Sequence, residues 1–205
     1  GLADAQIKSD KSKEAIQSLN NAIKINPKNA NSYITKASIY MNSENPTTAI
    51  KYIKQSLSID NNNEIGYFQL GNAEIMLKNY DFALIAFRKA TKINPKFWQC
   101  INNEGLVYFE LNQSEKAIKR FKLAIQISKD AEPMLALAIA LFSADNKSIK
   151  SISLGKNALK SNPNYASTEY QSKQLWGKNL QRAGTIFLKT KEMVKAVDEA
   201  KENTQ

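Results

Sequence analysis

The chain contains no histidine and only one cysteine, Cys100, among its 205 residues. Without histidine, Ser-His-Asp and Cys-His nucleophilic sites, HExxH zinc sites and histidine general bases are all excluded. A single cysteine cannot form a disulfide within the chain, so cysteine usage leaves the redox compartment open. The seven glycines form neither a GxGxxG fingerprint nor a phosphate-binding loop. The remaining carboxylates and lysines are scattered, and we therefore expect no catalytic site, no cofactor and no bound metal.

Long apolar segments are also missing. The longest uninterrupted apolar run, at 134–142, has nine residues, whereas a membrane-spanning helix needs about 20. The first ten residues have neither the basic flank nor the apolar stretch of a signal peptide. We therefore expect no membrane span in the chain and a cytoplasmic location, with any signal or anchor placed upstream of Gly1.

Arginine is scarce although the chain is basic. Of 29 basic residues only three are arginines, and 19 acidic residues leave a net charge of +10. Arginine binds phosphate groups through two parallel hydrogen bonds, whereas lysine acts as a point charge. The lysine surplus therefore indicates a solvated surface more than a nucleic-acid site, and we do not expect nucleic acid to be the main partner.

A period of 34 residues runs through the chain. The pentapeptide KINPK occurs at 24–28 and again at 92–96, at an interval of 68 residues, which is two such periods. Alanines recur at single periods, and so do small residues in a second series: Ala15, Ala49, Ala83 and Ala117, then Ala22, Ser56, Ala90, Ala124 and Ala158. A fixed period of this length without insertions is typical of stacked copies of one supersecondary unit.

Each unit of the period is predicted to be a pair of helices. Apolar residues at helical spacing predict an amphipathic helix over 80–93, and a second helix precedes it over 63–77, with a short polar turn between them. Prolines at 27, 95 and 163 follow the second helix of a pair, where they end it. Gly71 and Gly105 would each cost about 1 kcal/mol inside a helix. We therefore expect these two glycines to be retained because they allow close packing.

These signals resemble the tetratricopeptide repeat, a 34-residue helix-turn-helix unit. The third repeat carries the family's residues best: Tyr67, Leu70, Gly71, Ala83, Phe87, Ala90 and Pro95. The fifth is the most degenerate, with Ser151 and Gly155 at its small and aromatic positions. The segment KQLWGKNLQRAG and the lysine- and asparagine-rich composition are similar to tetratricopeptide proteins of cyanobacteria, some of which assist the assembly of photosynthetic complexes.

The resemblance implies an all-α protein, a right-handed α-solenoid of helix-turn-helix repeats. Residues 1–163 would form an array of about five repeats, and residues 164–205 would form C-terminal capping helices. The first repeat is truncated at its start, since only Leu2 and Ala3 remain to match Leu70 and Gly71. A solenoid needs such a terminal element to cover its last apolar face, and we expect Trp176 to pack within it.

The first helix of the fifth repeat is predicted to be apolar on all sides, which indicates burial all round. Its groove face must then be covered. We expect either the C-terminal segment or a partner protein to cover Ala136, Leu137 and Ala140.

In the family, the first helices of successive pairs line a concave groove and contribute ligand-binding residues from fixed positions. The resemblance therefore implies a peptide-binding set of thirteen residues: Asn31, Ile34 and Ser38 in the second repeat, Ile65, Phe68, Gln69, Asn72 and Ile75 in the third, and Gln99, Asn102, Asn103, Leu106 and Phe109 in the fourth. The set contains no lysine or arginine, unlike the family members that bind a C-terminal carboxylate. Amide side chains can both donate to and accept from a peptide backbone. Ordinary packing remains an alternative role for the apolar members.

The predicted function is thus that of a non-catalytic protein-protein interaction scaffold, which binds a peptide segment of a partner in its concave groove and assists in assembling a multiprotein complex. An alternative from another class is a solenoid that binds RNA or an anionic surface through its basic outer face. Four residues of one predicted second helix would supply that face: Lys116, Lys119, Arg120 and Lys122.

Overall fold

The computed structural model describes residues 12–145 and 149–203, and in these ranges it consists of helices and turns without a strand. The all-α prediction is confirmed. The remnant of a first helix predicted at Leu2 and Ala3 lies outside the described residues. The chain divides into two compact units, Gly1–Pro95 and Lys96–Gln205. This division falls inside the predicted repeat array, and the boundary placed after residue 163 stays a prediction.

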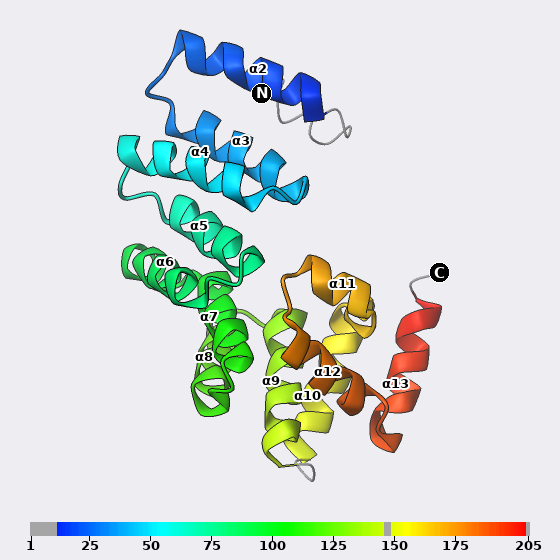
Figure 1. Cartoon of the computed structure of the whole chain (residues 1–205). Helices are drawn as coiled ribbons and strands as arrows, with labels where there is room; N and C mark the ends of the chain where they lie inside the picture. Colours follow the sequence, from blue (N-terminus) through cyan, green and yellow to red (C-terminus); the bar gives the residue numbers. More distant parts are fainter. Residues whose placement is uncertain (1–11, 146–148, 204–205) are drawn as a thin grey trace. The chain divides into compact units, whose positions relative to one another are not determined.

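Unit 1 is a row of antiparallel helices that pack on their neighbours in chain order (Figure 1). Its described helices are α2 (Ser12–Ile25), α3 (Ala30–Asn42), α4 (Pro46–Ile59), α5 (Glu64–Met76) and α6 (Tyr80–Ile93). The pairs α3 with α4 and α5 with α6 have the most extensive contacts. These two pairs, the second and third repeats, are the helical pairs that the 34-residue period predicts.

The turn inside each pair has the same backbone conformation in three successive repeats. Glu44, Lys78 and Asn112 have φ angles of 54°, 60° and 58°, a left-handed conformation that is uncommon outside glycine. They are spaced by one 34-residue period. The helix after the turn begins in a favourable way in the second repeat, where Pro46 is the first helical residue and the Asn45 side chain accepts a hydrogen bond from the Thr48 amide at 3.1 Å.

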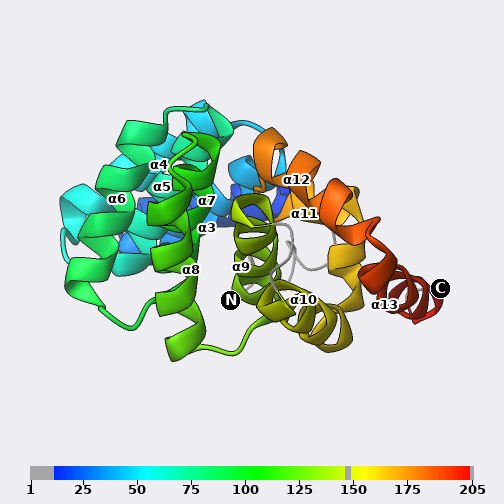
Figure 2. The ribbon, with the colours of Figure 1, turned by 90° about the horizontal axis from the view of Figure 1, so that it is seen from below.

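Unit 2 contains two further pairs and the C-terminal helices. Its elements are α7 (Trp98–Glu110), α8 (Ser114–Ile127), α9 (Ala131–Ala144), α10 (Ile149–Ser161), the 3-10 turn η1 (Pro163–Ala166), α11 (Thr168–Lys173), α12 (Lys178–Leu188) and α13 (Lys191–Glu202). Within this unit α9 packs against α8, α10 and α12, while α13 packs against α10 (Figure 2). The C-terminal helices therefore cap the fifth repeat, α9 and α10.

In the second, third and fourth repeats, a small residue on the first helix corresponds to a large one on the second helix. A β-carbon on Gly71 would overlap the ring of Phe87, and one on Gly105 would overlap the ring of Phe121. The expectation that these glycines serve close packing is confirmed. One period earlier the corresponding residues are Ala37 and Ile53, both fully buried.

The fifth repeat reverses this order of sizes, because Ile139 stands at the small position and Gly155 at the large one. The space above Gly155 is filled by the ring of Phe187 from α12. Conversely, Gly184 of α12 lies against Ile139. A β-carbon added to Gly184 would be 3.1 Å from Ile139 Cδ1. Gly155, which looks degenerate in the sequence, is therefore a residue on which α12 packs.

Candidate functional site

The predicted peptide-binding residues lie on three first helices, α3 and α5 in unit 1 and α7 in unit 2. Each unit presents them differently. On α7, four of the five are between 0 and 8% exposed: Asn102, Asn103, Leu106 and Phe109. The fifth, Gln99, is half-buried. Since α12 packs against both α7 and α9, these four side chains do not form part of an open surface.

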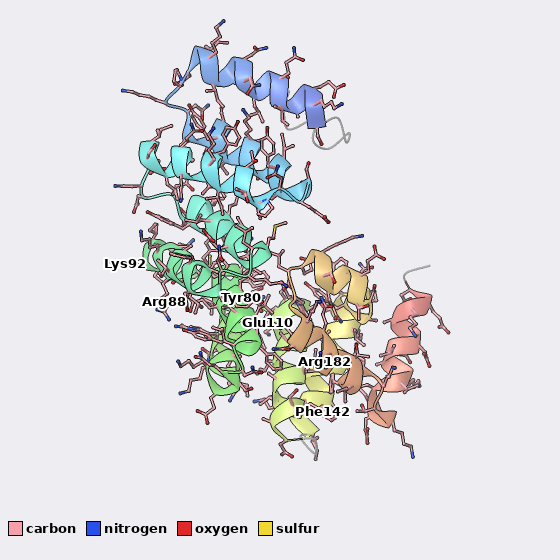
Figure 3. All side chains as sticks on the ribbon, viewed as in Figure 1. Tyr80, Arg88, Lys92, Glu110, Phe142 and Arg182 are labelled. Carbon is pink, nitrogen blue, oxygen red and sulfur yellow. The ribbon has the colours of Figure 1, made fainter. Side chains whose placement is uncertain are left out.

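The start of α12 is held by a side chain of α7. The two carboxylate oxygens of Glu110 accept hydrogen bonds from the backbone amides of Asn179 and Leu180, at 3.2 and 3.0 Å. The Glu110 side chain is labelled in Figure 3. The Asn179 side-chain amide donates to the Glu110 backbone carbonyl at 3.1 Å. Gly177, the N-cap of α12, makes no side-chain cap of its own. Glu110 therefore caps α12 from another helix, where a negative charge is also favoured by the helix dipole.

A second polar contact joins the C-terminal segment to α9. The indole nitrogen of Trp176 donates to Glu132 Oε1 at 3.0 Å, and Trp176 is 3% exposed, which confirms its predicted packing role. Burial raises the pKa of the Glu132 carboxyl to about 7, although hydrogen bonds from Trp176 and Asn102 oppose the shift. Burial likewise raises the pKa of the nearby Tyr165 phenol. Glu132 is thus a desolvated carboxyl group that accepts hydrogen bonds from neighbouring side chains.

The predicted cover over the fifth repeat is present within the chain itself. Ala136, Leu137 and Ala140 are at most 3% exposed, and α9 is contacted by α12. Of the two alternatives left by the sequence, the C-terminal segment and a partner, the structure has the first.

Unit 1 carries the other predicted residues on α3 and α5. Gln69 Nε2 donates to Ser38 Oγ at 2.8 Å, and the Ser38 hydroxyl donates to the Ile34 carbonyl at 3.1 Å. Because a hydroxyl has one proton to donate, Ser38 can only accept from Gln69, and this fixes the orientation of the amide. Gln69 Oε1 is then buried and, among the described residues, has no hydrogen-bond partner.

The side chains around Gln69 offer both polar and apolar contacts. Ile65 is 50% exposed and Ile34 only 8%. Asn31 is exposed, while Phe68, Asn72 and Ile75 are half-buried. We call these residues, together with Ser38 and Gln69, the α3–α5 face. Its uncharged amides can exchange hydrogen bonds with a peptide backbone, and its apolar side chains can contact apolar residues.

The sequence patterns did not predict one ion pair, in which the carboxylate is buried and the arginine is partly exposed. Arg120 Nε lies 2.9 Å from Glu104 Oε2, and the Glu104 side chain is 1% exposed. The repeat pattern has leucine at the position of Glu104. A charged residue at that position was the signal in the sequence that could have indicated the ion pair. The predicted basic outer face combined Arg120 with Lys116, Lys119 and Lys122, but the Arg120 guanidinium is engaged with Glu104. Lys116 Nζ also lies over the Tyr108 ring, 5.5 Å from its centroid. On the face made by these four residues, Arg120 Nε and Lys116 Nζ are thus each in contact with a side chain of α7.

Residues 12–145 and 149–203 contain no group of three or more cysteine, aspartate or glutamate side chains placed to bind a metal ion. None of the helices described there is both long enough and apolar enough to cross a bilayer.

A stack of helical pairs with a constant period, with polar and apolar side chains on its first helices, defines a helical-repeat binding protein. The tetratricopeptide repeat family matches residues 65–97 in one of its forms and residues 1–29, 30–63 and 99–130 in another. The chain belongs to the tetratricopeptide repeat family.

Related proteins match only parts of their own length. Human tetratricopeptide repeat protein 17 is 39% identical over 59 residues, which is 29% of this chain and 5% of that protein. The TPR repeat-containing thioredoxin TDX of Arabidopsis thaliana is 31% identical over 81 residues, 40% of this chain and 21% of that protein. The chain thus spans a small fraction of each of these relatives.

Solved structures show the same fold at low identity. PilF of Pseudomonas aeruginosa has a TM-score of 0.70 at 16% identity, with 97% of this chain and 94% of that chain covered. MamA has a TM-score of 0.68 at 21% identity, covering 84% and 98%. YrrB, described as a TPR protein with an unusual peptide-binding site, has a TM-score of 0.61 at 18% identity, covering 89% and 90%.

Proposed function

We propose that this protein is a non-catalytic interaction scaffold that binds a segment of a partner protein on the α3–α5 face. The observation that carries the proposal is the buried Gln69 Oε1, which lacks a hydrogen-bond partner among the described residues. A buried polar atom left in this state costs about 1 to 3 kcal/mol. Because the Gln69 residue as a whole is only half-buried, a rotation of its amide toward the surface would let a backbone N–H of a bound segment supply the missing donor and remove that cost.

The apolar part of the face would provide contact area for the same segment. Ile65 is half exposed, and Phe68 is supported from behind by the Phe87 ring, with centroids 6.3 Å apart. A preformed surface of this kind places most of the ordering cost on the partner. The peptide-binding site described for YrrB, which has a similar fold, supports a peptide as the ligand class.

The proposed site is narrower than the set implied by the repeat pattern. It retains the eight residues of unit 1, whereas binding through Asn102, Asn103, Leu106 or Phe109 would require α12 to leave α7. By holding one segment of a partner while the rest of the chain remains available, the scaffold would assist in assembling a multiprotein complex.

A peptide selection tests the proposal. Peptides selected from a random display library by the whole chain would be titrated by fluorescence polarisation against wild type, Gln69→Ala and a matched control, Gln55→Ala. Gln55 is an exposed glutamine on the second helix α4. We expect Gln69→Ala to weaken binding by about tenfold, the effect of one lost hydrogen bond, and Gln55→Ala to have no effect. Equal affinity for both variants would rule out this face.

A further inference from the structure

In the second and fourth repeats, one place between the two helices of the pair is filled by a long side chain from the second helix, Tyr52 or Arg120. In the second repeat, Lys36 Nζ lies 4.1 Å from the ring centroid of Tyr52. In the fourth, Arg120 reaches Glu104 at 2.9 Å. In the third repeat the corresponding residues, one period from each of these pairs, are Leu70 and Ala86. Alanine cannot fill the volume that tyrosine or arginine fills in the neighbouring repeats.

A cavity of about 280 Å³ lies at this position in unit 1 and is lined by Leu70, Ala86 and Tyr67, among others. Small-molecule sites typically have volumes of about 300 to 1,000 Å³. This cavity is slightly smaller and accommodates one large side chain better than a whole small molecule. We call it the α5–α6 cavity.

The rim of the α5–α6 cavity has apolar residues at positions where the second and fourth repeats have polar ones. Phe82 and Ile85 of α6 contribute to its lining and are 63% and 50% exposed. One period earlier these positions hold Thr48 and Lys51, and one period later Lys116 and Lys119. Exposed apolar side chains gathered around a cavity are typical of a protein interaction site.

The charged side chains of the cavity are mostly basic. Lys54 and Lys89 both line it and are exposed, and Lys89 Nζ lies 5.3 Å from the Tyr67 ring centroid. The lining carboxylate, Glu74, already accepts a hydrogen bond from Asn79 Nδ2 at 2.9 Å. Further along α6, Arg88 and Lys92 are also exposed (Figure 3). The surface thus complements negative charge.

We propose that the α5–α6 cavity is a second docking site, which takes an acidic amphipathic segment of a partner protein. One large apolar side chain of that segment, aromatic or leucine, enters between Leu70 and Ala86. Carboxylates beside it pair with Lys54 and Lys89. Since no residue of the α3–α5 face lines the cavity, the two surfaces are separable by mutation.

The second repeat supplies the test substitutions. Ala86→Tyr fills the cavity with the residue found at position 52, and Phe82→Thr installs the residue found at position 48. Phe82 is largely exposed, so its replacement preserves the fold even if the larger side chain at position 86 does not. The probe is a fluorescein-labelled amphipathic peptide with one tryptophan flanked by glutamates, and its companion has lysines in place of the glutamates. Both are titrated against the whole chain by fluorescence polarisation.

We expect wild type to prefer the glutamate peptide by at least about tenfold, and each variant to lose about tenfold in affinity, as for an anchor residue in a pocket. Gln69→Ala should bind the glutamate peptide as wild type does, so the outcome is distinguishable from that of the α3–α5 face.

Three kinds of result would each overturn the proposal. The first kind comes from the titrations themselves: no peptide binding, binding that does not depend on peptide charge, or an unchanged affinity in Phe82→Thr. The second is displacement of the peptide by a single-stranded oligonucleotide that itself requires Phe82, which would assign the surface to nucleic acid. The third is a dimer of wild type in sedimentation that Phe82→Thr abolishes, which would make a second copy of the chain the occupant.

Discussion

The ring of Phe87 occupies the space in which a β-carbon on residue 71 would lie, so Gly71 and Phe87 form a matched pair across α5 and α6. Phe87 is fully buried and cannot turn aside into solvent. The pair therefore sets how closely the two helices of the third repeat approach.

Gly71→Ala should destabilise the protein despite the better helix propensity of alanine. The substitution gains about 1 kcal/mol from propensity but overpacks the helix pair, which typically costs about 1 to 3 kcal/mol. Adding Phe87→Ile recreates the Ala37 and Ile53 combination of the second repeat. We expect the double variant to lose less stability than the two single variants summed, measured by urea unfolding followed by circular dichroism. Simple additivity would show that the ring and the β-carbon do not compete.

Phe187→Ala should release the C-terminal helices from the fifth repeat. The ring is fully buried and fills the space above Gly155, and removal of a buried phenylalanine typically costs about 3 to 5 kcal/mol. Hydrogen exchange should show lost protection in α12 and α13. Ile186→Ala is the control, because Ile186 is 60% exposed; if it loosened these helices as much, the contact with Gly155 would not be what holds them.

Stability should fall as pH rises through the range in which Glu132 titrates. Its pKa is raised from 4.5 to about 7, so the folded state holds this proton more tightly than the unfolded state does. The stabilisation is present below about pH 4.5 and is lost progressively up to about pH 7, an effect on the order of 3 kcal/mol. Glu132→Gln should flatten this part of the stability profile, because glutamine keeps an acceptor for Trp176 but does not ionise.

The matched control for this titration is Glu169→Gln. Glu169 is exposed, and its hydrogen bond and charge interaction with Lys173 lower its pKa. The control should leave the profile between pH 4.5 and 7 unchanged. The same unfolding measurement across pH checks both variants, and a Glu132→Gln profile identical to wild type would contradict the assignment.

The helical pairs and their packing were predictable because each depends on residues close in sequence and repeated at a fixed spacing. Gly71 and Gly105 could be identified from their cost inside a helix. The contacts of α12 were not predictable in detail. Glu110 bonds to residues 69 and 70 positions later, outside the repeat, and no periodic signal marks such a pair.

The residues of the proposed binding face were predictable from the repeat pattern, but their burial on α7 was not. The family positions on α3 and α5 gave the α3–α5 face, but the same positions on α7 are buried in a unit where α12 packs on α7 and α9. The Glu104 and Arg120 pair left a signal, a charged residue at a leucine position. The α5–α6 cavity left a weaker signal in the sequence. Alanine is common in helices, and Ala86 indicates a cavity only when it is compared with Tyr52 and Arg120 at the same position of the neighbouring repeats.

The exchange of sizes at Ile139 and Gly155 has a consequence for the growth of the array. A repeat array could in principle be extended by duplicating a unit, since each pair presents the same surface to the next. At the fifth repeat, however, the socket above Gly155 accepts a phenylalanine from a helix outside the 34-residue register. A further repeat could therefore pack on this side of the fifth repeat only if Phe187 left its place above Gly155.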